Sequence, residues 1–323
     1  MKAVRVHEFG GPEVLEYEDA PSPELGADDV LVKQEVIGVN FSDTLYRSGR
    51  YGGSLPLIPG HEGGGTIVEI GPNVRGFRPG DQVVYGGQHR RGTYKEEMAV
   101  EAAALVRIPV GLDLKQATAV LNQGRTAHYL THDAHPLAAD ERVLIHAAAG
   151  GVGANLVQMA KRRGAYVYAT VSTQEKADFV LGLGADEVIL YTEVDFEDEI
   201  KRRTDGEGLD VVFDALGGDI LLKSLRCLKR KGHLVTYGQT SGKPPPIEWP
   251  QRDLGSIYLS YHTGPDYVHP GEEAERRDAE IFGWVREGDL KVNIFGEYAL
   301  SEAARAHRDI GSRSTIGKLL LIP

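Results

Sequence analysis

The segment at residues 143–153, VLIHAAAGGVG, constrains the fold of this chain more than any other. Its first residues form an apolar run typical of a buried parallel strand, and its glycines permit a tight turn that a ligand can approach closely. The next residues, 154–163, have the composition of a helix. A helix that begins after a glycine turn presents backbone N–H groups to an anion. The segment therefore predicts a strand, a turn and a helix that bind the phosphates of a nucleotide.

The glycine motif itself is Ala147-x-x-Gly150-x-x-Gly153, in which alanine stands at the first glycine position of the usual dinucleotide fingerprint. A further strand is expected at 166–171, so the motif has the strand, helix and strand context that makes it specific. The alternative is a turn that connects strand to helix and binds nothing. The residues expected to bind the cofactor here are Ala149, Gly150, Gly151, Val152 and Gly153.

The end of the second strand decides between the two nicotinamide dinucleotides. An NAD site carries an acidic residue there, which binds the ribose 2′-hydroxyl. This chain has no carboxylate at the strand tip, and Ser172, Thr173 and Lys176 can donate hydrogen bonds to a 2′-phosphate. We therefore expect NADPH as the cofactor. Two alternatives stay open: Glu175 could be the acidic residue, although the first turn of a helix attracts carboxylates for structural reasons, and Lys176 could be a solvated helix lysine.

The organisation of the chain indicates two domains, for which 323 residues are sufficient. Up to about residue 120, short apolar runs alternate with glycine and proline, as expected of an irregular β domain. Helix and strand patterns then alternate, which predicts a parallel sheet with helices on both faces, and six strands can be counted from residue 143 onward. The last strand resembles the first domain. We expect one domain at 1–121 and 262–323 and the other at 122–261.

The individual elements follow from the same patterns. A proline-rich stretch at 240–250 is expected to be a loop. Helices are expected at 114–132, 154–163, 174–183, 219–228, 273–287 and 301–310. Strands are expected at 142–145, 166–171, 187–190, 209–214, 233–238, 256–261 and 317–322.

Composition excludes several classes of protein. The net charge of -11 argues against a nucleic-acid surface. No apolar run approaches the roughly 20 residues that cross a bilayer, and the first residues resemble a strand rather than a signal peptide, so we expect a cytoplasmic protein with no membrane contact. The single cysteine, Cys227, excludes an intrachain disulfide and a zinc site made of several thiolates.

Several motifs together resemble one family. They are HAAAGGVG at 146–153, GVNFSDTLYRSG at 38–49, FGGPEVL at 9–15 and the ending at 312–323. These segments resemble the NADPH-dependent quinone oxidoreductases related to zeta-crystallin, which are zinc-independent members of the medium-chain dehydrogenase/reductase superfamily. The resemblance covers essentially the whole chain. It implies an α/β protein with a GroES-like β-rich catalytic domain and a Rossmann domain, whose doubly wound parallel sheet has six strands.

The resemblance also bears on zinc. Zinc alcohol dehydrogenases of the superfamily carry cysteines at the positions of Asn40 and Asn122 and a His-Glu pair at the position of His61-Glu62. Two neutral amides cannot replace two anionic sulfur ligands. We therefore expect no metal and interpret His61 as a hydrogen-bonded structural residue. The retained His-Glu pair departs from many quinone reductases.

Further cofactor contacts are implied by the resemblance alone. Asn40 resembles the residue near the nicotinamide, and Thr126 resembles the threonine by the nicotinamide ribose or phosphate. Tyr191 and Lys176 resemble residues around the 2′-phosphate, although Tyr191 could be a half-exposed aromatic. The remaining cofactor neighbours are Gly238, Ser241 and Arg313, of which the last could be a surface charge.

Hydride transfer without a metal needs side-chain donors at the oxygen that gains charge. The candidates are the Asn40 amide and the hydroxyls of Tyr46 and Tyr51. Tyr51 matches a family tyrosine, whereas the family tyrosine nearest Tyr46 stands at the position of Leu45. Each tyrosine could instead be a packed aromatic. We expect Asp43 and Arg47 to form a structural polar pair.

The function expected from these features is metal-independent hydride transfer from NADPH to a quinone or another activated carbonyl or alkene. An enoyl or alkenal reductase and a nucleotide-binding protein with little catalysis are the alternatives, and the acidic charge gives no support to RNA binding. The strand at 256–261 would lie at a sheet edge and could pair with a second copy to form a homodimer, or be covered by a loop.

Overall fold

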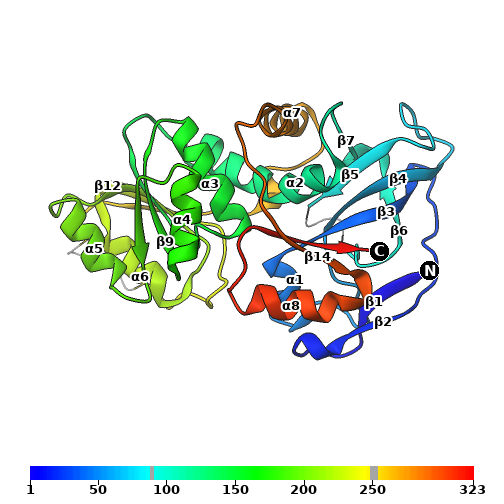
Figure 1. Ribbon diagram of the computed structural model, residues 1–323, viewed down its shortest axis with the longest axis horizontal. Helices are drawn as coiled ribbons and strands as arrows, with labels where there is room; N and C mark the ends of the chain where they lie inside the picture. The colour runs from blue at the N-terminus through cyan, green and yellow to red at the C-terminus, as the bar shows by residue number, and fades with distance from the viewer. Residues whose placement is uncertain (88–90, 248–253) are drawn as a thin grey trace. The chain divides into compact units, whose positions relative to one another are not determined.

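The computed structural model describes residues 1–87, 91–247 and 254–323, which form two compact units (Figure 1). One unit comprises Met1–Arg125 and Tyr267–Pro323, and the other comprises Thr126–Asp266. The chain thus leaves the first unit within a helix, α2 (Leu114–Tyr129), and returns to it near residue 267. The sequence placed these two changes at 121/122 and 261/262.

The unit at Thr126–Asp266 is built on a parallel six-stranded sheet in the order β10-β9-β8-β11-β12-β13. The order reverses between β8 and β11, which is where ligands bind in sheets of this type. This arrangement confirms the predicted Rossmann sheet. The strands are β8 (Arg142–Ile145), β9 (Tyr166–Val171), β10 (Glu187–Leu190), β11 (Leu209–Asp214), β12 (Leu228–Thr236) and β13 (Tyr258–Tyr261).

Helices cover this sheet. α3 and α4 pack on β8, β9 and β10, and α5 and α6 pack on β10, β11 and β12. α3 begins three residues earlier than predicted, which places the last two glycines of the motif in its first turn. The helices are α3 (Gly151–Arg162), α4 (Gln174–Gly182), α5 (Phe196–Arg203) and α6 (Gly218–Arg226), and α2 continues into a π-helical turn, Leu130–Ala134.

Helix α5 was not predicted, because charged residues fill most of its sequence, FEDEIKRR, and leave no apolar period. Its start is set by Asp195, whose carboxylate accepts hydrogen bonds from the N–H groups of Glu197 and Asp198. Acidic residues in its first turn and basic residues in its last also suit the helix dipole. Phe196 and Ile200 supply its buried contacts with the sheet.

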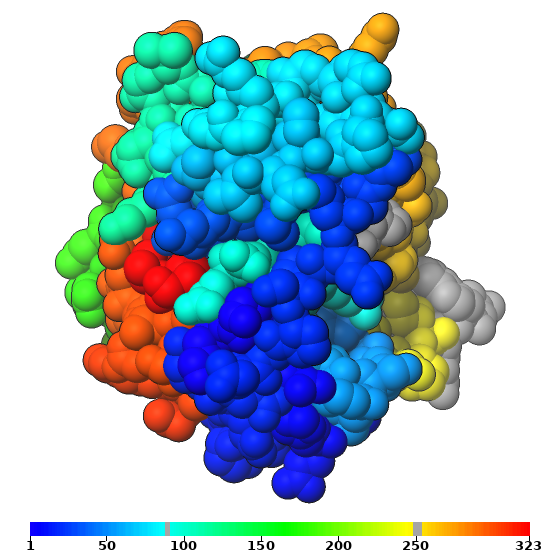
Figure 2. Space-filling model, turned by 90° about the vertical axis from the view of Figure 1, so that its right-hand side faces the viewer, coloured from blue at the N-terminus to red at the C-terminus, as the bar shows by residue number. Residues whose placement is uncertain are grey.

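The other unit contains a seven-stranded sheet in the order β14-β15-β3-β4-β5-β7, with β6 paired to β3, and a separate pair, β1-β2. The C-terminal strand β15 pairs antiparallel with β3, with Leu319 opposite Val39, which confirms that the end of the chain returns to the first domain. Figure 2 shows this C-terminal segment, in red, beside N-terminal segments in blue. The strands are β1 (Lys2–Val6), β2 (Leu15–Asp19), β3 (Asp29–Val39), β4 (Glu62–Ile70), β5 (Gln82–Gly86), β6 (Glu97–Glu101), β7 (Val106–Arg107), β14 (Ile294–Ala299) and β15 (Lys318–Ile322).

A short helix, α1 (Phe41–Arg47), follows β3 directly. Seven residues are too few for a recognisable apolar period, so this helix was not predicted. Its start is fixed by a capping box, in which Asn40 stands at the N-cap and the Asp43 carboxylate accepts the Asn40 backbone N–H at 2.9 Å. The remaining helices are α7 (Glu272–Glu287) and α8 (Ala303–Gly311), with 3-10 turns at Pro12–Val14, Ala102–Ala104, Gly264–Asp266 and Leu300–Glu302.

The predicted proline loop is described as far as residue 247 and contains no helix or strand there, and residues 248–250 lie outside the described residues. Within the described parts of the chain, none of the helices combines the length and the apolar character that a membrane span needs.

Candidate active site

The glycine turn between β8 and α3 has the backbone geometry of a phosphate-binding turn. Ala147 adopts a left-handed conformation, with φ of 50°, which explains why glycine is usual at this position of the fingerprint. A Cβ on Gly153 would lie 2.3 Å from the carbonyl oxygen of Ala147. Only glycine therefore lets the first turn of α3 pack this closely on the end of the strand.

The N-terminus of α3 is not capped by a side chain. Its N-cap residue is Gly150, which has no side-chain oxygen to accept the first N–H groups of the helix. Those groups belong to Gly151, Val152 and Gly153, and the helix dipole adds partial positive charge at the same place. The turn can therefore hold an anionic diphosphate through backbone donors.

A set of polar residues lies where β9 and β10 end side by side. Ser172 and Thr173 follow β9, Tyr191 follows β10, and the Tyr191 backbone N–H donates to the carbonyl of Val171 at 3.2 Å. Thr173 also caps α4 by accepting the Lys176 backbone N–H. The sequence-predicted residues of the 2′-phosphate site therefore converge at one edge of the sheet.

Lys176 is only 8% exposed, so its interpretation as a solvated helix lysine is wrong. Burial lowers the pKa of its ammonium group, and the nearby carboxylate of Glu175 opposes that shift. A phosphate dianion at this position would offset the cost of desolvating the lysine. Glu175 itself is exposed.

The other predicted cofactor neighbours are distributed over both units. Gly238 and Ser241 follow β12 and lie against the loop after β11: a Cβ on Gly238 would approach the Ala215 carbonyl oxygen to 2.7 Å, and the Ser241 N–H donates to Leu216. Thr126 is half-buried in α2. Arg313 belongs to the other unit, is exposed and has a left-handed φ of 59°.

Asn40 lies at the centre of a buried polar cluster in the unit that holds the chain termini. Its Nδ2 donates to the Glu62 carboxylate at 2.7 Å, and its Oδ1 accepts from Lys318 at 3.0 Å and from Gln123 at 3.4 Å. These contacts fix which face of the amide carries the N–H groups. One N–H of Asn40 donates to Glu62, and the amide carries a second N–H that can donate to another group.

Glu62 and Lys318 form an ion pair in the interior, with 0% and 2% of their surfaces exposed. Lys318 is the first residue of β15 and Glu62 the first of β4, so the C-terminal strand brings the cation to the carboxylate. Neither charge could stay buried without the other. The ion pair and Asn40 therefore form one buried, mutually dependent cluster.

His61 lies next to this cluster. Its Nδ1 is 2.9 Å from the Asp43 carboxylate and its Nε2 is 3.3 Å from the side-chain nitrogen of Asn122. Burial alone would lower the pKa of His61, but the Asp43 carboxylate outweighs burial and raises the pKa above its ordinary value. The same carboxylate binds the Asn40 backbone, so a single side chain positions both residues.

Asp43 and Arg47 do not pair directly as predicted. The Tyr94 hydroxyl lies 3.1 Å from Asp43 and 3.0 Å from His307, and the other ring nitrogen of His307 lies 3.1 Å from Arg47. The two charges are thus joined through a buried tyrosine and a buried histidine. Burial lowers the pKa of His307 to about 4, so its ring is neutral.

Tyr46 and Tyr51 meet edge to face, with ring centroids 5.2 Å apart. The Tyr46 hydroxyl accepts a hydrogen bond from Arg91 at 2.5 Å, and the Arg91 guanidinium stacks 3.9 Å above the Tyr46 ring. Burial raises the pKa of Tyr46, so its hydroxyl keeps its proton at neutral pH and has an O–H to donate while it accepts from Arg91. Both tyrosines reach the surface.

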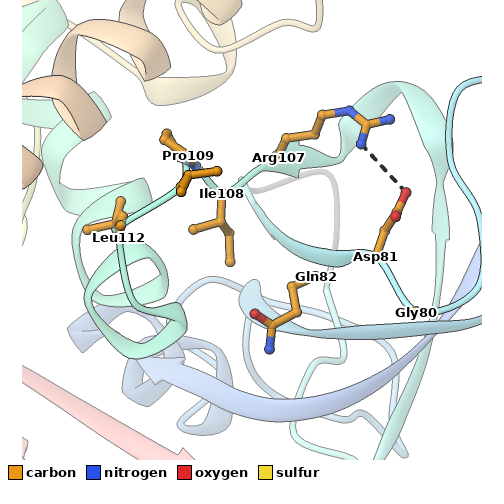
Figure 3. A pocket seen from close by; sticks show the side chains of 9 residues that line it. Gly80, Asp81, Gln82, Arg107, Ile108, Pro109 and Leu112 are labelled. Atoms are coloured by element: carbon orange, nitrogen blue, oxygen red, sulfur yellow. Dashed lines mark ion pairs between the residues drawn. The ribbon is translucent and has the colours of Figure 1, made fainter.

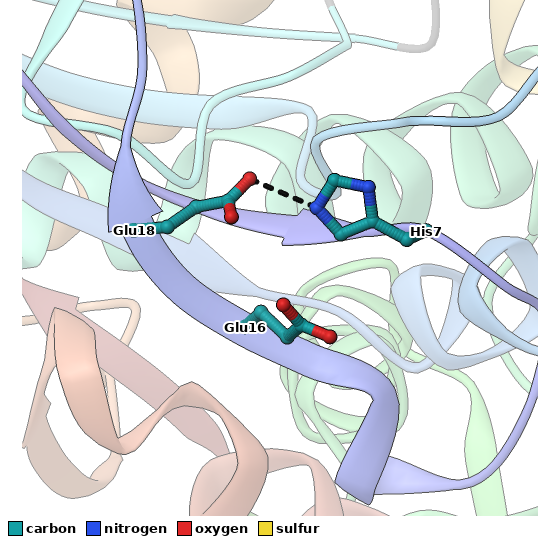
Figure 4. Close-up of side chains that lie close together, drawn as sticks. All are labelled: His7, Glu16 and Glu18. Atoms are coloured by element: carbon teal, nitrogen blue, oxygen red, sulfur yellow. Dashed lines mark hydrogen bonds and ion pairs between the residues drawn. The ribbon is translucent and has the colours of Figure 1, made fainter.

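Two other features of this unit are less suited to chemistry. His7, Glu16 and Glu18 lie together on the β1-β2 pair (Figure 4), but they are largely solvated, and Glu18 is already paired with His7 and Arg5, each at 2.9 Å. A surface hollow at the Arg107–Asp81 ion pair (Figure 3) is lined by these two residues, by Gln82 and by the segment 108–112. Neither contains a predicted site residue.

Comparison with known proteins covers the entire chain. Residues 26–110 match the alcohol dehydrogenase GroES-like domain, and residues 151–264 match the zinc-binding dehydrogenase family. A quinone oxidoreductase of Pseudomonas aeruginosa is 38% identical over 100% of this chain and 99% of its own length. The crystal structure of Escherichia coli quinone oxidoreductase complexed with NADPH has a TM-score of 0.96 and 35% identity, with 100% of both chains covered.

The chain belongs to the quinone oxidoreductase family. A 2-haloacrylate reductase of Burkholderia is also similar, with 36% identity over 100% of this chain and 99% of that protein. The resemblance inferred from the motifs, and the GroES-like and Rossmann folds that it implied, are thereby confirmed.

The residues at the positions of the zinc ligands do come together in this family member, but they do not fit a metal. The Lys318 ammonium lies 3.0 Å from the oxygen of Asn40 and would repel a cation there. His61 keeps one ring nitrogen, Nε2, that could bind a metal, but Asn122 offers only a neutral amide and the Glu62 carboxylate is already paired with Lys318. Tetrahedral zinc needs several anionic or imidazole ligands, and this cluster leaves a single imidazole nitrogen for it.

Sequence reasoning missed several members of the cluster, namely Gln123, Tyr94, His307, Lys318 and Arg91. Lys318 carried a signal, because a lysine directly before the run LLLI of a buried strand requires a buried anionic partner. The others come from distant loops and helices, and nothing in their local sequence connects them to Asn40.

Proposed function

We propose that this protein is an NADPH-dependent quinone reductase that works without a metal. The observation that carries the proposal is the buried residue Lys176 in the first turn of the helix that Thr173 caps, directly after Ser172 at the end of β9. Such a set binds a phosphate better than a ribose hydroxyl, and the NADPH-bound relative from E. coli supports the same cofactor.

The residues described above fit NADPH. The turn from Ala149 to Gly153 would hold the diphosphate, and Ser172, Thr173, Lys176 and Tyr191 would hold the 2′-phosphate. Thr126, Gly238, Ser241 and Arg313 complete the proposed set. Bound NADPH supplies a hydride from its nicotinamide ring.

The catalytic residues in this proposal are Asn40, Tyr46 and Tyr51. The remaining N–H of the Asn40 amide and the tyrosine hydroxyls are the donors available to a substrate oxygen that gains charge. The Glu62–Lys318 pair keeps the Asn40 amide in one orientation, and Arg91 fixes the Tyr46 hydroxyl. The unit at 1–125 and 267–323 would thus act on the substrate, and the unit at 126–266 would bind the cofactor.

A second candidate function is reduction of an activated carbon–carbon double bond, such as that of a haloacrylate or an alkenal. The similarity to the Burkholderia 2-haloacrylate reductase favours it. The two reactions share the hydride donor and differ only in the acceptor. Substrate profiling separates them.

The test is a steady-state assay with 1,4-benzoquinone, 1,2-naphthoquinone, 2-chloroacrylate and a short alkenal, each with NADPH and with NADH. We expect quinone turnover with NADPH preferred and with no loss of rate after chelation. Lys176→Met should remove the preference for NADPH. The control is Lys161→Met on α3, which loses an ion pair with Asp186 and should keep the preference. Turnover of the acrylate alone would favour the second candidate, and no turnover of any acceptor would favour a nucleotide-binding protein.

We also propose a homodimer formed through β13. Tyr258 and Tyr261 on this edge strand are 62% and 72% exposed, and among the described residues the strand pairs on one side only, with β12. Light scattering of the protein and of Leu259→Lys would test this assembly, since a charge on the edge opposes pairing between copies. A cytoplasmic location is part of the proposal and is supported by the single, buried cysteine.

A further inference from the structure

We propose that His61 is the proton donor of the reaction and delivers a proton from Nε2 to the substrate oxygen. This assignment rests on the proposed function, because it requires an acceptor whose reduction takes up a proton. It replaces the purely structural role expected for His61 from the sequence. It also gives the cluster at Asn40 an acid in place of the metal that related dehydrogenases use.

The inner side of the His61 ring is held by a carboxylate. Nδ1 lies 2.9 Å from Asp43, and both groups are buried. The Asp43 carboxylate is in turn fixed by the Asn40 backbone N–H at 2.9 Å and by the Tyr94 hydroxyl at 3.1 Å. A ring held in this way keeps its Nδ1 protonated, so only Nε2 can exchange a proton.

The outer side of the ring faces a partly exposed residue of α2. Nε2 lies 3.3 Å from the side-chain nitrogen of Asn122, which is partly exposed, whereas His61 is buried. Since the Asn122 amide can present either its nitrogen or its oxygen, it can face Nε2 in the neutral and in the protonated state of the ring. Asn122 therefore lies between the acid and the outside of this unit.

Quinone reduction takes up one proton besides the hydride, and a buried acid can deliver it. The quinone accepts a hydride, which carries two electrons and one proton, and becomes a hydroquinone monoanion. The anionic oxygen takes the proton from Nε2 of His61, and an O–H bond forms while the N–H bond breaks. The neutral ring then regains a proton from water past Asn122. In sum, one NADPH, one proton and one quinone give NADP⁺ and one hydroquinone.

The charges around His61 favour its protonated form. Asp43 on α1 and Glu62 on β4 are anionic, and Lys318 on β15 is the opposing cation, already paired with Glu62. Tyr94 and His307 reach the ring only through Asp43. The pKa of His61 lies above its ordinary value, so the protonated ring persists to a higher pH than in an ordinary histidine and is lost as the pH rises through that pKa.

The experiment compares His61→Gln with His307→Gln. Each removes a buried histidine from the same network, but His307 contacts only Tyr94 and Arg47 among the hydrogen-bonded groups described above. With 1,4-benzoquinone and saturating NADPH, we expect kcat of His61→Gln to fall about 100-fold. In this variant, the fall of kcat at alkaline pH and the solvent deuterium isotope effect on kcat should both disappear, while the Kd for NADPH stays unchanged. His307→Gln should keep both signatures.

The wild-type enzyme provides a test that does not depend on a variant folding. The pH at which its kcat falls should coincide with the titration of the His61 ring followed by ¹⁵N NMR. If the ring titrates at a different pH, or if His61→Gln keeps its kcat within threefold and its pH profile unchanged, the assignment is overturned. A wild-type protein that reduces none of the acceptors would instead contradict the proposed function itself.

Discussion

Two buried histidines, one in each unit, have pKa values shifted in opposite directions. His146, at the end of β8 beneath the glycine turn, lies 2.9 Å from the hydroxyls of Thr170 and Ser224, and burial lowers its pKa to about 3. His61 is buried to a similar degree, but the carboxylates of Asp43 and Glu62 raise its pKa. The neighbouring groups, and not the degree of burial, therefore decide the direction of the pKa shift.

The same contrast separates the two units around these histidines. Near the glycine turn, neutral hydrogen bonds and backbone conformation determine the geometry, as the left-handed Ala147 shows. Around Asn40, charges that compensate one another determine it: Asp43 with His61 and Glu62 with Lys318. Changes in charge should therefore be most damaging in the second region, and changes in shape in the first.

The largest effect is expected for Lys318→Met. This substitution leaves the Glu62 carboxylate buried and uncompensated, which should cost about 3–5 kcal/mol of unfolding free energy. Denaturant unfolding measures the loss. Lys115 provides the matched control, because it pairs with Glu297 at 2.7 Å with both side chains more than 40% exposed, and Lys115→Met should cost no more than about 1 kcal/mol.

Adding Glu62→Gln to Lys318→Met should recover part of the stability, because the variant no longer buries a lone charge. A double variant as unstable as the single one would mean that packing, and not charge, makes Lys318 important. The contrast between the two units would then be weaker than the ion pair suggests.

The next effect is expected for Gly153→Ala. Its new Cβ would meet the backbone of Ala147 and Ala148 at 2.3 and 2.7 Å, so α3 must move away from the strand. NADPH binding, measured by fluorescence titration, should weaken on the order of 100-fold, or about 2.8 kcal/mol. Gly182, in α4, has open space at its Cβ position, and Gly182→Ala should leave binding unchanged. Equal affinities of the two variants would show that the close approach of α3 is not required.

The glycine-turn region was largely predictable from the sequence. The strands at 142–145, 166–171, 187–190 and 209–214 were predicted with the bounds that the structure shows, because each is a short apolar run bounded by turn residues. α5 was not, because it is stabilised by a cap and by charge pairs instead of by an apolar face. The start of α3 was misplaced because glycines are unusual inside a helix.

The cluster around Asn40 was not predictable to the same extent. The positions of Asn40, His61 and Asn122 were identified by resemblance. The rest of the network comes in part from Lys318, which contacts Asn40, and from Tyr94 and His307, which act through Asp43. Those residues are separated from Asn40 by more than 50 positions in the chain. A charge network closed by the fold leaves no local pattern in the sequence.

A smaller effect concerns the pH dependence of stability. Neutral His146 stabilises the folded state above pH 6.5, and this contribution is lost as the pH falls, because the unfolded chain binds the proton first. At pH 5 the loss should reach about 2 kcal/mol. His61 has the opposite sign: its contribution is complete below pH 6.5 and is lost as the pH rises through its raised pKa.

Unfolding of His146→Gln and His61→Gln between pH 5 and pH 8 measures both signs. Relative to the wild type, His146→Gln should lose stability less steeply as the pH falls, and His61→Gln should show its largest deficit in acid. Two variants that follow the same pH dependence would contradict the opposite pKa shifts of the two rings.

The smallest effect is expected for Ala147→Gly. The left-handed φ of 50° destabilises an alanine by about 1–2 kcal/mol, and glycine removes this strain. Part of the gain is lost, because glycine makes the unfolded chain more flexible and so raises the entropy that folding removes. We expect a net gain of about 0.5 kcal/mol with NADPH affinity unchanged. The neighbouring Ala148→Gly has no such strain to relieve and removes a buried methyl group, so it should be destabilising. If both variants lose stability equally, Ala147 must contribute packing that outweighs its backbone conformation, and shape at the turn would depend on side chains as well as on glycine.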